Sequence, residues 1–405
     1  MNTDRRRLHS ESSRDHDDEL LLSTLRRKAQ LTLEANLVQT SRGALFAAGG
    51  HQFRTLWVRD FCFSVPGLIA AGFTEIVEAQ IQLFLSHLSP EGMAPRGLDV
   101  IDPKLRVLSA TALRGLPERV HPRAFDYQRN ELRAEYLGEH GTPAFDSGLL
   151  LIRATRDFAQ ATHRAFPISE THLDAIWKFY EPARSPIHPA LLHQPAFADW
   201  QDSARRQGLV LHTQLLHLQA AEWLEQSGLR NAGRRPSTSE IRDGISRQFA
   251  PLASGLRPEF PDAQQVSLDS HALLIRENLL GGSSALWSAL QDSPWMTSPG
   301  LPIRPHYPRS EVSWTTQAVG LRHYHDGLKW GWIIAESAAI CYSQGDRARG
   351  DQCLVALAKM EDGRFLSEVF DDRGRFDGIR YRSESPFTWT AAKVLEALAL
   401  RPSNT

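Results

Sequence analysis

The stretch that decides the fold runs from residue 54 to residue 75 and reads "RTLWVRDFCFSVPGLIAAGFTE". Its apolar residues form a helix-like run, which is ordinary for a buried segment. A tryptophan, an arginine and an aspartate stand at the mouth of this run, namely Trp57, Arg59 and Asp60. Charged residues are almost never fully buried unless they are paired. An ion pair where the core begins therefore needs an explanation that the rest of the chain has to supply.

The composition is that of a soluble globular protein, with 41% hydrophobic and 23% charged residues among 405. The net charge of −1 provides no strong field that would draw the chain to nucleic acid or to a membrane surface. No run approaches the roughly 20 uninterrupted apolar residues of a transmembrane helix. Three scattered cysteines make no disulfide framework. We therefore expect a cytoplasmic protein without a nucleic-acid or membrane partner, and its oligomeric state is open.

Apolar residues recur at helical spacing along most of the chain, whereas alternating strands are few and short. Two strand candidates, "RGALFAA" at 42–48 and "HQFRTLWV" at 51–58, are predicted to pair as a hairpin. The predicted helices are 19–38, 64–71, 75–88, 146–161, 170–180, 209–225, 238–249, 271–277, 327–344, 347–360 and 387–400.

Long loops rich in Pro, Arg and His separate these helices, and no Ser/Gly linker divides the chain. Long loops in an ordered domain are uncommon unless they build a site. The sequence therefore predicts one all-α catalytic domain of paired helices at 19–405, whose loops carry function. The residues before it, 1–18, are charged and polar, lack the apolar core of a secretory signal, and are predicted to be disordered.

Several of the ten tryptophans stand beside charged residues. Trp200 lies between Asp199 and Asp202, and Trp389 follows Glu384. Core packing is a sufficient explanation for any one of them. The repeated pairing of tryptophan with carboxylate favours a carbohydrate site, because an aromatic face supports the C–H side of a sugar ring while carboxylates and arginines bind its hydroxyls.

Two segments hold candidate catalytic carboxyl groups. Asp202, in "FADWQDSARRQG", stands before a helix, where a carboxylate also stabilises the helix N-terminus. If an aromatic neighbour desolvates it, its pKa rises and it stays protonated as an acid. Glu368, in "DGRFLSEVFDDRG", has apolar neighbours, and a salt bridge to Arg364 or Arg373 is the structural alternative. From local sequence, both interpretations stay open for each residue.

Other reaction types find little support in the sequence. It has no G-x-S-x-G nucleophile elbow, and "AAGG" at 47–50 lacks the Lys-Ser/Thr of a P-loop. The segment "HYHDGLKWGW" at 323–332 has two histidines, but a metal site needs further ligands. We expect neither a metal nor an organic cofactor.

Six blocks of the chain resemble the (α/α)6-barrel glycosidases, in that family's order and over roughly residues 50–400. "LWVRDFCFSVPGLIAAGFTEIVEAQIQLFL" looks like the invertase pattern VRDF-x-x-S-A, and "FDSGLLLIRATRDF" is similar to DSGLWWI. "WQDSARRQGLVLHTQLLHL" resembles WMDA and IDRRMG, and "YHDGLKWGWI" looks like YHNG-x-x-WPW. "GRFLSEVFDDRG" and "SPFTWTAAKVLEAL" resemble the P/S-E-aromatic-D stretch and QAWSVAEVLRAL. The nearest patterns are those of the neutral/alkaline invertases and of the amylo-α-1,6-glucosidase domain of glycogen-debranching enzymes.

The resemblance implies an (α/α)6 toroid with minor short strands in loops, and an inverting glycoside hydrolase acting on an α-glucoside (an oligosaccharide, a glucan branch or a sucrose-like sugar). It implies that Asp202 is the general acid and Glu368 the general base, about 6.5–9.5 Å apart so that water fits between base and sugar. Arg59 and Asp60 would then hold sugar hydroxyls while Trp57 packs on the ring, which explains the opening ion pair. The other residues implied to line the pocket are Asp146, Trp200, Gln214, Tyr324, His325, Asp326, Trp330 and Trp389.

The chain departs from the family pattern near the substrate. The family glutamate after IDRRMG is His212 here, the YHNG asparagine is Asp326, and the doubled aromatic of DSGLWWI is Leu149–Leu150. The catalytic pair is therefore better supported than the substrate, and a glucoside better than either sucrose or an α-1,6-glucan.

Two functions of other classes remain open. A sugar epimerase or isomerase on the same toroid would move protons with histidine pairs, for which His323/His325 and His212/His217 could serve. A non-catalytic carbohydrate-binding protein would turn one carboxyl group away from the cleft, since the fold alone does not settle function. The groups that converge on the pocket discriminate between these alternatives.

Overall fold

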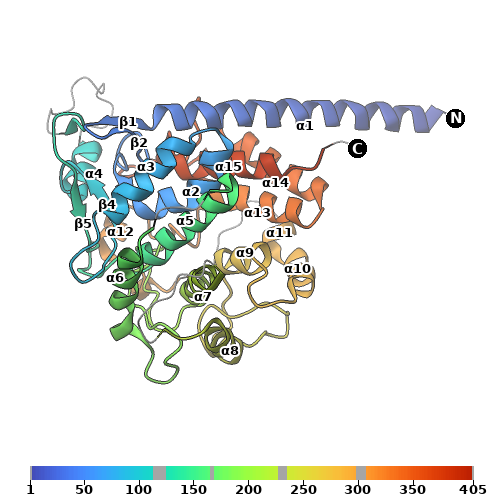
Figure 1. Cartoon of the computed structure of the whole chain (residues 1–405). Helices are drawn as coiled ribbons and strands as arrows, with labels where there is room; N and C mark the ends of the chain where they lie inside the picture. Colours follow the sequence, from blue (N-terminus) through green and yellow to red (C-terminus); the bar gives the residue numbers. More distant parts are fainter. Residues whose placement is uncertain (1, 113–124, 165–167, 227–234, 298–306, 404–405) are drawn as a thin grey trace.

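The structure is a computed structural model of the chain (Figure 1), and it describes all residues except 1, 113–124, 165–167, 227–234, 298–306 and 404–405. The side chains of 2–15, 110–112 and 297 are likewise not described. The described chain is mainly helical, with a few short strands. None of the described helices is both long enough and apolar enough to span a lipid bilayer.

Six helices form a closed inner ring, in which each helix contacts the next and the last contacts the first. Long-range packing therefore joins segments from both ends of the chain. In ring order these helices are α2 (Val58–Ala70), α5 (Ser147–Thr162), α7 (Leu211–Gln226), α9 (Leu268–Arg276), α13 (Gly331–Ser343) and α15 (Thr388–Leu400).

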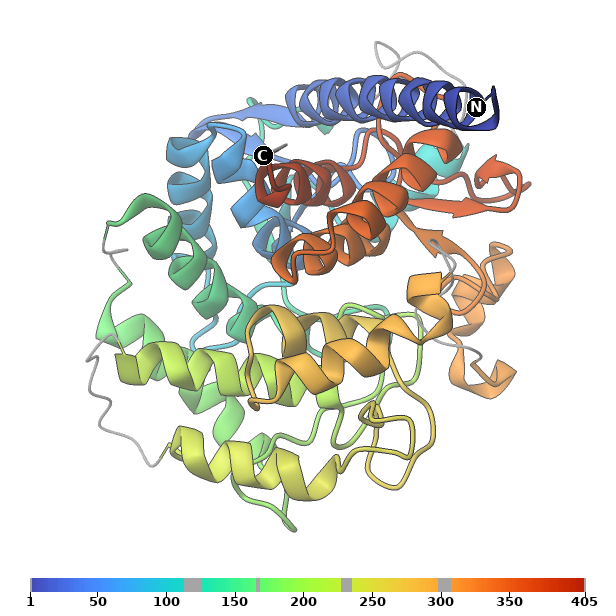
Figure 2. The same ribbon diagram turned by 90° about the vertical axis from the view of Figure 1, so that its right-hand side faces the viewer.

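A second set of helices packs outside this ring, each against one or two inner helices. The first of them, α1, lies along α14 and α15, so the blue and red ends of the chain are side by side (Figures 1 and 2). The outer helices are α1 (Asn2–Ala35), α3 (Thr74–Leu85), α6 (Glu170–Tyr180), α8 (Thr238–Gln248), α10 (Ser283–Gln291) and α14 (Arg347–Met360).

The inner position of a helix follows from its sequence, because a helix that is apolar all round must be covered on every side. Every residue of α13 from Gly331 to Tyr342 is buried, and so is every residue of α15 from Thr388 to Leu398. Where α15 meets α2, the backbones approach so closely that a Cβ on Gly67 would come within 1.9 Å of the Ala392 carbonyl oxygen. Only glycine permits this contact.

The remaining elements lie in the connections between helices. Three small antiparallel sheets are present among the described residues: β1 (Leu37–Thr40) with β2 (Gly43–Phe46), β3 (Leu56–Trp57) with β4 (Gly97–Asp99) and β5 (Arg133–Glu135), and β6 (Lys329–Trp330) with β7 (Val369–Asp371) and β8 (Gly374–Arg375). The short helices are α4 (Pro103–Ala112), η3 (Glu181–Ala183), α11 (Pro294–Thr297), η4 (Arg309–Glu311) and α12 (Trp314–Ala318).

The all-α fold class predicted from the sequence is confirmed, and every predicted helical range overlaps a helix. The predicted hairpin is wrong, because β2 pairs with β1 rather than with the segment at 51–58, whose strand β3 pairs with β4. In the structure α1 begins at Asn2, and the disorder predicted for 1–18 stays a prediction. No Gly or Pro interrupts residues 1–35, so nothing in the local sequence ends the helix. The extent of the catalytic domain stays a prediction.

Candidate active site

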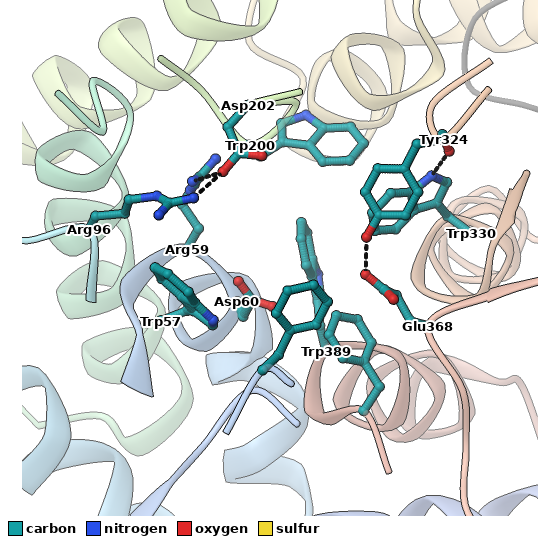
Figure 3. Close-up of a pocket in the computed structure, with 12 residues that line it drawn as sticks. Trp57, Arg59, Asp60, Arg96, Trp200, Asp202, Tyr324, Trp330, Glu368 and Trp389 are labelled. Atoms are coloured by element: carbon teal, nitrogen blue, oxygen red, sulfur yellow. Dashed lines mark hydrogen bonds and ion pairs between the residues drawn. The ribbon is translucent and has the colours of Figure 1, made fainter. Parts of the chain in front are cut away.

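A cavity of about 120 Å³ opens at the N-terminal ends of the inner helices α2, α13 and α15. Trp57 and Trp330 directly precede α2 and α13, and Trp389 stands in the first turn of α15. Figure 3 shows Asp202 and Glu368 on opposite sides of this cavity. The lining residues are Phe53, Trp57, Arg59, Asp60, Arg96, Trp200, Asp202, Tyr324, Trp330, Glu368, Phe387 and Trp389.

Two guanidinium groups converge on the carboxylate of Asp202. Arg59 Nη2 lies 2.8 Å from its Oδ2, and Arg96 Nη2 lies 2.7 Å from the same atom. Burial alone would raise the pKa of Asp202, but the two positive charges outweigh it and hold this pKa well below its usual range. The sequence predicted the opposite shift from desolvation, because the partner Arg96 lies in a distant loop.

Arg59 is itself enclosed by acceptors. It donates to the backbone carbonyl of Asp199, and its Nε lies 3.8 Å from Asp146. Burial raises the pKa of Asp146 to about 7, and it raises the pKa of Asp60 to about 7 as well. Asp146 is fully buried and lies behind Arg59, outside the cavity lining.

Glu368 occupies the opposite wall and is bound by two phenols. The hydroxyls of Tyr324 and Tyr381 both donate to its carboxylate, that of Tyr381 over 2.5 Å. Burial raises the pKa of Glu368 to about 8, while the two phenol hydrogen bonds work in the opposite direction and the nearby Glu384 adds to the rise. In the free protein the pKa of Glu368 therefore lies well above that of Asp202.

Tryptophans make up much of the remaining surface. Trp200 meets Trp330 and Trp389 edge-on, with ring centroids 5.6 and 5.9 Å apart. Its indole Nε1 donates to Asp269 over 2.7 Å, and that of Trp330 donates to the carbonyl of Tyr324 over 2.9 Å. These hydrogen bonds fix the ring planes, so the cavity offers rigid apolar faces beside charged groups.

Nine of the residues predicted for the site line this cavity together. They are Asp202, Glu368, Trp57, Arg59, Asp60, Trp200, Tyr324, Trp330 and Trp389.

Besides Asp146, three predicted residues are not among the cavity's lining. Gln214 exchanges both its amide hydrogen bonds with the backbone of Leu192, over 2.9 and 2.7 Å. His325 is buried and stacked on Trp330, with ring centroids 5.3 Å apart. Asp326 accepts from the backbone N–H of Tyr307 over 2.6 Å. Gln214 and Asp326 are hydrogen-bonded within the protein, and His325 is packed against Trp330. None of the three lines the cavity.

The four histidines named for an epimerase do not converge either, and no histidine is among the described residues that line the cavity. His212 lies 3.3 Å from Asp269, and His217 packs against Trp177 on a separate cavity. Burial lowers the pKa values of His212, His217 and His325 to about 4, 3 and 3. His323 is more than half exposed and pairs with Asp326.

The site also contains residues that the sequence did not reveal: Arg96 and Tyr381, and the aromatic rings of Phe53 and Phe387. Tyr381 stands three residues before Glu384, so the aromatic–carboxylate pairing used for the tryptophans could have found it. Arg96 had no such signal. Within the described part of the chain, no group of three His, Cys, Asp or Glu side chains could hold a metal ion.

No protein-family model matches the sequence, and no curated protein matches it significantly. Solved structures do match. A glycosidase in complex with glucose superposes with a TM-score of 0.63 at 14% identity, covering 96% of this chain and 99% of that one. A GH63 mannosylglycerate hydrolase from Thermus thermophilus in complex with Tris and D-glycerate gives 0.58 at 15%, with 92% and 99% covered.

A rhamnosidase from Klebsiella oxytoca with rhamnose bound superposes with a TM-score of 0.61 at 13% identity. The match covers 93% of this chain but only 63% of the rhamnosidase, so the chain spans less than two thirds of that protein. Identities this low establish architecture alone. The chain has an (α/α)6-toroid fold.

Proposed function

We propose that the protein is an inverting glycoside hydrolase that cleaves an α-glucoside, with Asp202 and Glu368 as its proton-transferring pair. The observation that carries the proposal is that these two carboxyl groups lie across one cavity walled by tryptophans and arginines. Hydrolysis with inversion needs two carboxyl groups on opposite sides of the scissile bond, with space for a water. The tryptophan faces suit the C–H side of a sugar ring.

The names of the structural neighbours support a carbohydrate substrate, since they are a rhamnosidase, a glycosidase bound to glucose and a mannosylglycerate hydrolase. The epimerase alternative loses support, because its histidines lie outside the cavity and burial keeps three of them neutral. A mere sugar-binding protein has no need for two carboxyl groups that both face the cavity.

In this proposal Asp202 donates a proton to the leaving oxygen and Glu368 accepts one from the attacking water. The pKa values in the free protein have the opposite order from the one that these roles need, because burial raises the pKa of Glu368 to about 8 and two arginines lower that of Asp202. The opposite assignment, with Asp202 as base and Glu368 as acid, has a difficulty of its own, because a carboxylate bound to two guanidinium groups is a poor base. Under either assignment the arginine contacts must loosen when substrate binds.

The test compares Asp202→Asn with Glu368→Gln. Each variant should lose about 10²–10⁴-fold in turnover of an unactivated α-glucoside. α-Glucosyl fluoride has a leaving group that needs little acid help, so it should restore Asp202→Asn far more than Glu368→Gln. Proton NMR of the first product should reveal the β-anomer. Release of the α-anomer would contradict inversion, and preferential rescue of Glu368→Gln would reverse the two roles.

The substrate is found by screening α-glucosides, namely sucrose, trehalose, maltose, isomaltose, kojibiose, glucosylglycerol and limit dextrin, for released sugar. Hydrolysis of none of them, together with no hydrolysis of α-glucosyl fluoride, would contradict the proposed function.

A further inference from the structure

Arg96 occupies an unusual position on the cavity wall. Its Nη2 lies 2.7 Å from Asp202, its Nη1 lies 3.5 Å from Glu135, and its guanidinium carbon stands 4.5 Å above the ring centre of Trp57. The stacking on Trp57 fixes the plane of the guanidinium group, as a cation–π contact does. One edge of that plane faces Asp202 and the cavity (Figure 3).

Arg59, the second arginine at Asp202, is held more firmly than Arg96. Arg59 is bound to the carbonyl of Asp199 and lies close to Asp146 as well as to Asp202, and its side chain is 7% exposed against 16% for Arg96. Arg96 is therefore the arginine better placed to exchange Asp202 for another anion.

The charges on this wall favour such an exchange. When Asp202 takes up the proton that it needs as an acid, two guanidinium groups lose their shared counter-charge. The neighbouring carboxyl groups compensate poorly, because burial raises the pKa of Asp60 and Asp146 to about 7 and also raises that of Glu135. An arginine fork binds carboxylates and phosphates in the same planar, two-bond manner.

We propose that Arg96 is a specificity residue, which binds an anionic group on the leaving part of the substrate, a carboxylate or a phosphate, and thereby releases Asp202. This inference rests on the proposed function and deepens it, since it names the class of aglycone. The anion replaces Asp202 as the hydrogen-bond acceptor of Arg96 Nη2, and the negative charge of the anion then lies beside Asp202.

The exchange turns Asp202 into a proton donor. Loss of the Arg96 hydrogen bond and the approach of a like charge both favour the protonated form of a carboxyl group. The other groups that act on the charge of Asp202 are Arg59, Asp60, Asp146 and His325.

When the substrate binds, Glu368 releases a proton to solvent and Asp202 takes one up from solvent, so the number of protons on the two carboxyl groups does not change. In the reaction that proton passes to the glycosidic oxygen as its bond to the anomeric carbon breaks. The oxygen of water bonds to that carbon, and a proton of the water passes to Glu368.

The test uses three α-glucosides that differ only in the aglycone: glycerol, glycerate and glycerol phosphate. For the wild type, kcat/KM should be about 10-fold or more higher for the anionic glucosides than for the neutral one, because charge-assisted hydrogen bonds are the stronger kind. Comparison of the carboxylate with the phosphate identifies the preferred anion. In Arg96→Gln the preference should disappear, and in Arg96→Lys part of it should remain.

Arg129→Gln is the matched control, because Arg129 is a largely exposed arginine that pairs with Asp126 outside the cavity. It should keep the full preference. Thermal melting of all variants separates a change in selectivity from a loss of folding. A wild type that does not prefer the anionic glucosides, or a preference that Arg96→Gln keeps, overturns the inference.

A binding measurement is independent of turnover. Calorimetric titration with glycerate and with glycerol phosphate should give binding to the wild type and to Arg129→Gln, and none to Arg96→Gln. Binding to none of the proteins overturns the inference. If α-glucosyl fluoride is hydrolysed but no anion preference appears, this inference fails and the proposed function stands. If the anion binds through Arg96 but no glycoside is cleaved, the proposed function fails and the anion site stands.

Discussion

Removal of one phenol from Glu368 should raise the pKa of this carboxyl group. In the wild type the Tyr381 hydroxyl donates to the carboxylate over 2.5 Å, and this hydrogen bond stabilises the ionised form. Tyr381→Phe removes the donor and little else. A hydrogen bond to a charged group contributes about 1.5–3 kcal/mol, and one pKa unit corresponds to about 1.4 kcal/mol. The pKa of Glu368, about 8 in the wild type, should therefore rise by about 1–2 units.

The pKa can be measured directly in protein whose glutamates carry ¹³C at the carboxyl carbon. The resonance of Glu368, assigned by its absence in Glu368→Gln, is followed from pH 5 to 11. Tyr342→Phe is the matched control, because that phenol donates to Asp351 over 2.6 Å, away from the cavity. It should leave the Glu368 titration in place. A pKa that falls or stays unchanged in Tyr381→Phe would refute the reasoning.

Three further changes test the packing and the charges. Arg59→Ala should lower the free energy of unfolding by about 3 kcal/mol, because it leaves a partly buried Asp202 with one cation fewer; urea denaturation measures this, and an unchanged midpoint would contradict it. Gly67→Ala should destabilise by about 1–3 kcal/mol, since its Cβ would meet the Ala392 carbonyl at 1.9 Å, and a melting temperature equal to the wild type would exclude that contact. Burial raises the pKa of Glu361 to about 7, so the folded state binds more protons than the unfolded state up to that pH, and stability is lost as pH rises through it. Between pH 6.5 and 8.5 the free energy of unfolding should therefore fall by about 0.8 kcal/mol less in Glu361→Gln than in the wild type. Urea denaturation at the two pH values measures this fall, and an equal fall in both proteins would contradict the prediction.

The helices were predictable because their signal is local. Apolar spacing within one segment is enough to indicate α5 or α14, and the order of the sequence blocks was enough to indicate the toroid. The pairing of strands was not, because Trp57 pairs with Gly97 across forty residues of chain. That pairing places Arg96 at the cavity, and the sequence of the loop around Arg96 has no periodic pattern from which this position could be predicted.

The charge state of the site was missed for the same reason. Asp202 stands beside Trp200 in the sequence, which indicated desolvation, but the groups that decide its pKa arrive from α2 and from the loop before β4. Some polar residues that were predicted to line the pocket instead make contacts within the protein. Gln214 satisfies the backbone of Leu192, a role that a residue type alone does not distinguish from a contact with sugar.

The contact between α2 and α15 has a consequence for how the protein folds during synthesis. The ring is closed by its first and last members, so the surface of α2 around Gly67 stays uncovered until residues 388–400 have left the ribosome. Contacts between segments so distant in sequence form late, because closing a long loop is opposed by chain entropy. Meanwhile an open arc of apolar helices is exposed to other chains, which is the condition under which intermediates aggregate. Shortening the chain before α15 should therefore yield insoluble protein rather than a weakened enzyme, and efficient production should depend on chaperones that protect the arc until it closes.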